Sequence, residues 1–302
     1  MDRQEALYNE RLGAEPLRTK NDKMIDVYSN ALLCAPTFFS NENALLDSIR
    51  DIHGQMFGSD YDDAGQFRAR QLFSYPKVTT NGMYPNYNPP SPDEILPAME
   101  ALSEYISTPN ELDPLIKVAL VYYQLATIRP FLVGNGVIER ICVNYLLVET
   151  GMLSRPLLCF SEDLFASDAE FRDALRLIRD HGRGFEEWAK FFLTVAGRAA
   201  EKTIAMLDEL HKLRLSDLER LRGYEKCSSL LLAFYNYLWE APVIEARGMI
   251  PVLNVSYNTV AKAIEILCDL KILEHIDTKM RYRKFGYKKF LNICYNRNSG
   301  QP

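Results

Sequence analysis

The amino-acid sequence predicts a mainly α-helical protein with one β-hairpin and a smaller mixed domain at its C-terminal end. Apolar side chains recur at helical spacing over most of the 302 residues, for example in the stripe Trp188, Phe191, Phe192 and Val195. Asn81-Gly82 between aromatic runs is the strongest short-range signal for a hairpin. From Glu225 onward, eleven basic and seven acidic residues give a net charge of +4, against −9 for the rest, which indicates a second domain.

The overall composition is that of a water-soluble globular protein. Hydrophobic residues make up 47% and charged residues 25% of the chain, and the net charge of −5 gives no global sign of nucleic-acid binding. The start of the chain has no apolar signal core, and apolar runs such as 230–239 are far shorter than the ~20 residues that span a bilayer. We therefore expect no membrane span. The six cysteines are scattered without a C-x-x-C pair, so we expect reduced thiols and a cytoplasmic protein.

The pattern of helices divides the chain into four expected parts. These are an arm at 1–22, a helical domain at 23–210, a charged connector helix with a solvated face at 211–224, and a C-terminal domain at 225–302. Within the helical domain we expect helices at 23–33, 43–56, 91–107, 112–128, 136–149, 163–182 and 185–211. Ser91 is the clearest cap, because Pro92 and two acidic residues follow it and favour a helix start.

A glycine-rich turn between two apolar helices is the candidate functional site. Pro130 ends the first helix, because it has no N–H group and restricts the residue before it. Gly134-Asn135-Gly136 then opens the second helix, where backbone N–H groups can converge on an anion at the positive helix end. The segment is therefore a candidate phosphate cradle, and the alternative is an ordinary corner between two helices.

Residues 129–140 resemble the signature of the Fic family, which reads His-Pro-Phe-x-Asp/Glu-Gly-Asn-Gly-Arg-x-x-Arg. The chain keeps the family's Pro, Phe, Gly-Asn-Gly and second Arg, which are Pro130, Phe131, Gly134, Asn135, Gly136 and Arg140. The resemblance implies a helical core, ATP as a ligand, and transfer of AMP from ATP to a hydroxyl group of a target protein. It also implies that Gly134, Asn135, Gly136 and Arg140 contact the nucleotide phosphates.

Three signature positions are different in this chain. Arg129 stands where the family has its catalytic His, and an arginine cannot act as a base because it keeps its proton. Val133 replaces the metal-binding acid, so Mg²⁺ could be held only through nucleotide phosphates, and Val137 replaces the first phosphate-binding Arg. We therefore expect an impaired AMP-transfer site. The alternatives are an active transferase with altered chemistry and a structural protein with an empty loop.

A second stretch resembles the Fic family's flap, a β-hairpin that positions the target protein. Ala64-Gly65-Gln66-Phe67-Arg68 resembles the motif before the flap, and the expected flap strand comprises Leu72, Phe73, Ser74 and Tyr75. A surface hairpin without a special role is the alternative. Glu10 is a weak candidate for the family's inhibitory Glu, with a solvated charge as the simpler interpretation. His53 is expected to be a packed helix residue.

Residues 255–273 read Val-Ser-Tyr-Asn-Thr-Val-Ala-Lys-Ala-Ile-Glu-Ile-Leu-Cys-Asp-Leu-Lys-Ile-Leu and resemble the recognition helix and first wing strand of a winged helix-turn-helix domain. Ser256 is a plausible cap for the helix after it, and six basic residues fall between Lys279 and Lys289 with aromatic residues among them. The residues expected to contact DNA are Tyr257, Asn258, Lys262, Arg281, Arg283 and Lys284. The helix offers no Arg for a bidentate guanine contact, so protein binding or homodimerisation is the alternative to a DNA-binding regulator.

Overall fold

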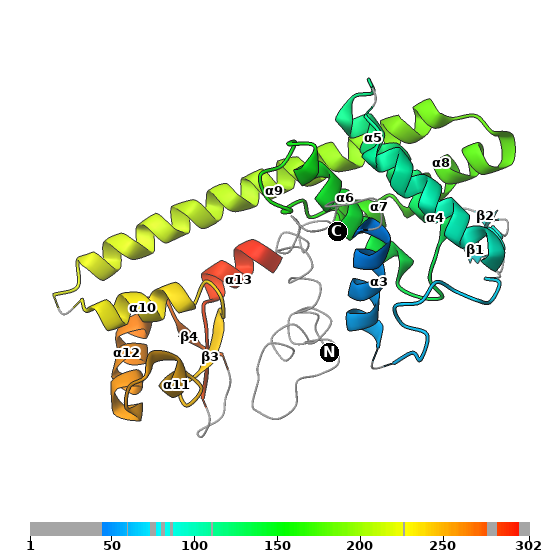
Figure 1. The fold of residues 1–302 in the computed structure, drawn as a ribbon. Helices are drawn as coiled ribbons and strands as arrows, with labels where there is room; N and C mark the ends of the chain where they lie inside the picture. The colour runs from blue at the N-terminus through cyan, green and yellow to red at the C-terminus, as the bar shows by residue number, and fades with distance from the viewer. Residues whose placement is uncertain are drawn as a thin grey trace. The chain divides into compact units, whose positions relative to one another are not determined.

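The computed structural model describes residues 44–58, 60–72, 77–79, 82–84, 87–109, 111–225, 227–276 and 283–295 (Figure 1). The chain folds into two compact units, and the boundary between them lies between Thr203 and Ile204. The part before this point is called the first unit, and the part after it the second unit. Several expected features lie outside the described residues, namely the arm at 1–22 with Glu10, the helix at 23–33, the flap residues Phe73, Ser74 and Tyr75, and Arg281.

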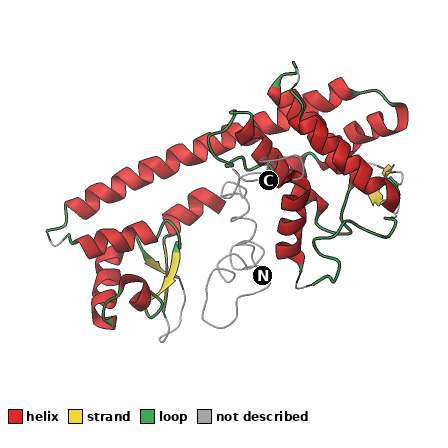
Figure 2. Ribbon diagram, viewed as in Figure 1, coloured by secondary structure: helices red, strands yellow, loops and turns green. Residues whose placement is uncertain are grey.

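The first unit is helical apart from one small hairpin (Figure 2). Its helices are α3 (Ala44–Phe57), α4 (Pro92–Ser107), α5 (Pro114–Ile128), α6 (Asn135–Glu149), α7 (Ser161–Ala166), α8 (Asp168–His181) and the start of α9 (Phe185–Arg222). Apolar side chains from these helices form one core, in which Trp188 is fully buried and donates a hydrogen bond from Nε1 to Ala119 O at 2.7 Å. The single helix expected at 163–182 is wrong, because the structure divides it at Ser167 into α7 and α8.

The start of α4 confirms the predicted cap. The Ser91 N–H donates to Glu94 Oε2 at 2.8 Å, and the Ser91 hydroxyl donates to the same oxygen at 2.7 Å. Pro92 takes the first helical position, where its missing N–H costs no hydrogen bond. The local residues alone therefore determine where this helix begins.

The hairpin is present as strands β1 (Lys77–Thr79) and β2 (Gly82–Tyr84). The two strands are antiparallel, with Thr79 opposite Gly82, so Gly82 is already a strand residue. The expected strand run began earlier, at Gln71, and this start is wrong because Gln71 and Leu72 have no strand geometry.

The second unit packs helices against a three-stranded antiparallel sheet. Its elements are α10 (Ser229–Tyr237), β3 (Val243–Glu245), α11 (Met249–Leu253), α12 (Tyr257–Asp269), β4 (Glu274–His275), β5 (Lys284–Gly286) and α13 (Lys288–Tyr295), with the strands in the order β3-β5-β4. They surround a separate apolar core. The predicted cap of α12 is confirmed, because Ser256 Oγ accepts a hydrogen bond from Thr259 N at 3.3 Å.

Helix α9 is continuous over 38 residues, although two successive helices were expected there. The expected solvated face of its charged part is wrong for Asp217, whose side chain is fully buried. Tyr287 donates a hydrogen bond to Asp217 Oδ2 at 2.5 Å, and Arg220 Nη2 lies 3.3 Å from Asp217 Oδ1. Within the described ranges, neither α9 nor any other helix is long and apolar enough to cross a membrane.

Candidate functional site

The glycine-rich loop between α5 and α6 has two residues in the left-handed backbone region. Arg129 ends α5 with φ of 48°, and its N–H donates to Leu125 O at 3.0 Å. Gly134 caps α6 with φ of 73°. A Cβ atom at Gly134 would lie 2.4 Å from the ring of Phe57, so only glycine fits there. The loop therefore passes close to Phe57 at the C-terminal end of α3.

The Asn135 side chain closes this loop on itself. Its Oδ1 accepts a hydrogen bond from Phe131 N at 2.9 Å, and its Nδ2 donates to Phe131 O at 2.7 Å. The side chain is 5% exposed. Asn135 was expected to contact a ligand. In the structure both polar atoms of its side chain bond to Phe131, and its backbone N–H lies at the start of α6.

His53 holds the same loop from α3. The Gly65 N–H donates to His53 Nδ1 at 2.9 Å, so Nε2 carries the ring proton and donates to Val133 O at 3.0 Å. The imidazole stacks on Phe131 with ring centroids 3.9 Å apart, and burial lowers the pKa of His53. The expectation of a packed histidine is confirmed, and both ring nitrogens are already engaged in structural hydrogen bonds.

Arg68 connects the loop to the chain that returns from the hairpin. Its side chain is 2% exposed, and Nε donates to Arg129 O at 3.0 Å. Its Nη2 donates to Pro90 O at 2.5 Å, and its backbone N–H donates to Pro130 O at 2.8 Å. The sequence analysis used Arg68 only as part of a motif and missed this role. A buried arginine can serve several carbonyl groups because it carries five donors.

Arg179 of α8 holds the C-terminal end of α5. Its Nη2 donates to Ala126 O at 2.7 Å, and its guanidinium lies 3.6 Å from the ring centroid of Tyr87. The Tyr87 hydroxyl in turn donates to Thr127 O at 2.8 Å. Burial lowers the pKa of Arg179 and raises that of Tyr87. Sequence reasoning missed this contact, since its partners are about fifty residues apart and follow no local pattern.

The start of α6 is the part of the loop that can bind an anion. Val137 N and Ile138 N both donate to Gly134 O, which leaves the N–H groups of Asn135 and Gly136 without an acceptor inside the helix. Arg140 lies on the same helix end, with Nη1 3.2 Å from the position of a Cβ atom on Gly136. The structure thus brings together all four residues that were expected to contact phosphate.

The two valines of the loop do not fit a magnesium site. Val133 and Val137 are partly buried and pack against the apolar core of the first unit. Mg²⁺ prefers oxygen ligands, and the Val133 carbonyl already accepts a hydrogen bond from His53. The side chains at these positions therefore supply no metal ligand.

A buried acid, Glu139, lies one helical turn after Asn135. Its side chain is 8% exposed, and burial raises its pKa to about 7. Arg129, Arg140 and Arg179 act in the opposite direction, because their positive charges favour the ionised carboxylate. Sequence reasoning also missed Glu139. The one available signal was an acid on a mostly apolar helix with few other charges.

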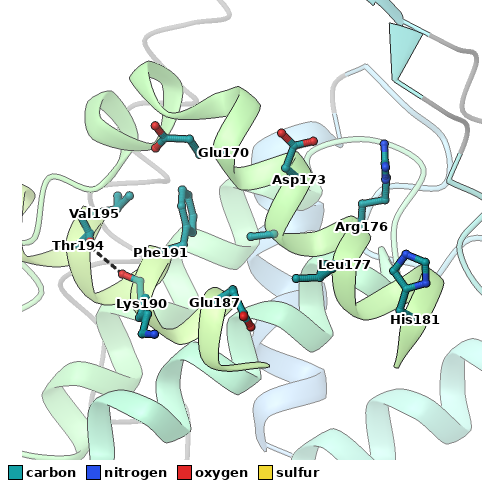
Figure 3. Close-up of a pocket in the computed structure, with 11 residues that line it drawn as sticks. Glu170, Asp173, Arg176, Leu177, His181, Glu187, Lys190, Phe191, Thr194 and Val195 are labelled. Atoms are coloured by element: carbon teal, nitrogen blue, oxygen red, sulfur yellow. Dashed lines mark hydrogen bonds between the residues drawn. The ribbon is translucent and has the colours of Figure 1, made fainter. Parts of the chain in front are cut away.

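A separate hollow of about 710 Å³ lies between α8 and the first turns of α9 (Figure 3). Both acidic and basic side chains line it, including Glu170, Asp173 and Arg176 from α8 and Glu187 and Lys190 from α9. The mixed charges give this hollow no preference for one kind of ligand.

The second unit places four expected DNA contacts around one groove. Tyr257, Asn258 and Lys262 of α12 line it together with Arg283, and Tyr257 is 50% exposed. Glu245 and Glu265 lie in the same walls, so the groove is mixed in charge. Lys284 lies in β5 opposite Glu245 of β3.

Comparisons with known proteins agree on the first unit. The model of the Fic/DOC family matches residues 43–147. Protein adenylyltransferase Fic of Nematostella vectensis is 30% identical over 114 residues, which cover 37% of this chain and 24% of that protein. Protein adenylyltransferase fic-1 of Caenorhabditis elegans is 22% identical over 130 residues, which cover 42% of this chain and 24% of that protein. The chain thus spans about a quarter of the length of the curated relatives that it matches.

The fold is similar to that of a solved structure over nearly the whole chain. The crystal structure of a Fic family protein from Desulfovibrio desulfuricans aligns with a TM-score of 0.55, at 12% sequence identity. The alignment covers 94% of this chain and 79% of the other. At this identity the likeness concerns the fold alone.

Proposed function

We propose that loop 129–140 binds nucleotide phosphates but is impaired in the transfer of AMP, because residues 43–147 match the model of the Fic/DOC family. One observation carries this proposal. The loop keeps the glycine turn, with Gly134 at φ of 73° against Phe57, while positions 129, 133 and 137 carry side chains unsuited to the transfer. The relatives named protein adenylyltransferase make ATP the first nucleotide to test.

Three features of α6 support phosphate binding. The N–H groups of Asn135 and Gly136 have no intrahelical acceptor, and the helix N-terminus carries a partial positive charge. Arg140 adds a full positive charge beside them. A phosphate group matches this arrangement, since it offers several acceptor oxygens and a negative charge.

The side chains at the changed positions support the loss of transfer. Arg129 keeps its proton at neutral pH and cannot accept one from an incoming hydroxyl. Loss of a general base typically costs about 10²- to 10⁴-fold in rate. Val133 packs against the core and offers no oxygen to a metal ion, which removes a second source of charge stabilisation.

The binding half is tested by calorimetry with ATP and AMP, with and without Mg²⁺. We expect binding that does not need the metal and that weakens about tenfold in Arg140→Ala, as for the loss of a charged hydrogen bond. The control is Arg155→Ala, at an exposed position of the same unit, which should bind as the native chain does. No detectable binding at millimolar nucleotide would refute the proposal.

The transfer half is tested by restoring the family residues. The combined change Arg129→His, Val133→Asp and Val137→Arg should produce AMP transfer from ATP to protein, whereas the native chain should show none. Labelled ATP and protein mass measure the product. Transfer by the native chain that disappears in Arg140→Ala would instead establish the competing function, an active transferase with altered chemistry.

We also propose that the hairpin binds a target protein and that the second unit binds DNA. The β1–β2 hairpin comes after the Arg68 region, as the family's flap does, and so offers strand edges to a target protein. Within the second unit, residues from about 225 onward have the order helix, strand, helix, helix, strand, strand, which is typical of winged-helix domains, followed by the helix α13. Exposed Tyr257, Asn258, Lys262 and Arg283 around one groove support DNA as its ligand.

DNA binding is tested with a mixed-sequence duplex at low and moderate salt. We expect binding that weakens steeply with salt and further in the double variant Lys262→Ala with Arg283→Ala. The control is Lys212→Ala, at an exposed position of α9. Absence of binding at low salt would favour the protein-binding or homodimer alternative, which light scattering over a concentration series then examines.

A further inference from the structure

Glu139 lies among charged groups from three elements of the first unit. Arg129 comes from the end of α5, Arg140 from α6 itself, and Arg179 from α8. The other titratable groups near Glu139 are Tyr122 of α5 and Cys142 of α6. A carboxyl group that is 8% exposed therefore interacts electrostatically with three guanidinium groups, a phenol and a thiol.

Tyr122 and Cys142 are both buried. The Tyr122 hydroxyl is buried and, within the described residues, has no hydrogen-bond partner. Burial raises the pKa of Tyr122 well above its usual range and that of Cys142 to about 12, so neither group ionises near neutral pH. Glu139, with a pKa of about 7, is then the group of this cluster that changes its charge in the physiological range.

Two of the arginines near Glu139 belong to the proposed phosphate site. Arg140 is the cation at the start of α6, and Arg129 occupies the first position of the loop. An ionised Glu139 neutralises part of their positive charge and repels a phosphate group. A protonated Glu139 does neither, so the same arginines attract the phosphate more strongly.

We propose that binding of phosphate at loop 129–140 is coupled to the uptake of a proton by Glu139. The coupling rests on the proposed phosphate site and adds its regulation by pH. A bound phosphate adds negative charge near the carboxyl group, which favours its protonated form, so the protein takes up a proton as the ligand binds. By linkage, the affinity falls as the pH rises above 7, where Glu139 of the free protein is ionised.

The test uses calorimetry with metal-free ATP at pH 6 and pH 8 on the native chain and on Glu139→Gln. Glutamine keeps the shape of the side chain and cannot ionise, so the variant should bind about three- to tenfold more tightly than the native chain at pH 8. At pH 6 the two affinities should be equal. The ligand's own titration is the same in both measurements and cancels in the comparison. Glu149→Gln, at an exposed position of the same helix, is the matched control and should behave as the native chain.

A second measurement needs no substitution in the core. At pH 7, titrations of the native chain and of Glu149→Gln in two buffers with different ionisation enthalpies count the protons taken up on binding. We expect an uptake beyond that of the ligand itself, and its absence would overturn the coupling even if Glu139→Gln did not fold.

The two proposals fail in different ways. A native chain that does not bind ATP at either pH overturns the phosphate site and the coupling with it. A native chain that binds ATP with the same affinity as Glu139→Gln at pH 8, and without extra proton uptake, leaves the phosphate site in place and overturns the coupling alone.

Discussion

Two buried acidic side chains, Asp217 in the second unit and Glu139 in the first, are held in different ways. Asp217 of the second unit is fully buried, accepts a hydrogen bond from Tyr287 at 2.5 Å and lies 3.3 Å from Arg220. Glu139 of the first unit has three arginines around it, yet burial outweighs their attraction and its pKa is about 7. The difference indicates that Asp217 holds elements of its unit together, whereas Glu139 can gain and lose a proton near neutral pH.

The largest effect is expected at Asp217. Asp217→Ala removes the acceptor of the buried Tyr287 hydroxyl and the partner of Arg220. Breaking a buried pair on one side typically costs about 4 kcal/mol, so the free energy of unfolding of the second unit should fall by that amount. Urea denaturation followed by fluorescence measures it. Asp208→Ala, at an exposed position of α9, is the control, and equal effects of the two would contradict a structural role for Asp217.

The next effect is expected at Glu139 and depends on pH. The ordinary pKa of a glutamate side chain is 4.5, and the pKa of Glu139 in the folded chain is about 7. Between these values the folded state binds more protons than the unfolded state, so stability falls as the pH rises and the loss is complete above 7. Glu139→Gln should therefore raise the free energy of unfolding by up to about 3 kcal/mol at pH 8 and change it little at pH 5. Urea denaturation at both pH values measures this, and a gain that is equal at pH 5 and pH 8 would argue against titration of Glu139.

A smaller effect is expected at Asn135. Asn135→Ala leaves the buried N–H and C=O groups of Phe131 without their side-chain partner, which should lower the free energy of unfolding of the first unit by about 2 kcal/mol. Thermal unfolding followed by circular dichroism measures the shift in Tm. The control is Gln124→Ala, at an exposed position of α5, and a Tm shift no larger than that of the control would show that the loop does not need this brace.

The smallest effect is expected at Ser256. Ser256→Ala removes the hydroxyl that accepts from Thr259 N at the start of α12, which should cost about 1 kcal/mol of the second unit's stability. Ser256→Gly should recover part of the loss, because glycine is a tolerated cap. Urea denaturation measures the change in the free energy of unfolding. The value for this exposed cap can then be compared with the values for the buried groups. No recovery with glycine would mean that the hydroxyl has a partner beyond the cap.

The sequence predicted those features of the fold that have local signals. The starts of α4 and α12 were predicted from Ser91 and Ser256, and the end of α5 and the start of α6 from Pro130 and the glycines. The break at Ser167 also has a local signal, because Ser167-Asp168-Ala169-Glu170 has the pattern of a capping box, but the apolar periodicity runs across it and favoured a single helix. The continuity of α9 was likewise hidden, since a run of charges at its centre is compatible with both a break and a helix.

The candidate site was predictable where its residues are neighbours along the chain. Gly134, Gly136 and Arg140 lie within seven residues, and the structure brings them together at one helix end. The contacts of Arg179 with α5 join residues about fifty positions apart, and the burial of Glu139 depends on how several helices pack. Such effects arise from tertiary packing, which a pattern in one segment does not encode.

The way in which loop 129–140 is held has a consequence for how freely its residues can be exchanged. Its backbone is supported by the side chains of His53, Arg68 and Asn135. None of these supports uses the side chain of residue 129, 133 or 137. The hydrogen bonds that shape the loop are therefore independent of the side chains at these three positions, although Val133 and Val137 add apolar packing. A catalyst can lose its reaction in such a loop without losing its fold, and the reaction can be built back onto a frame that is already folded.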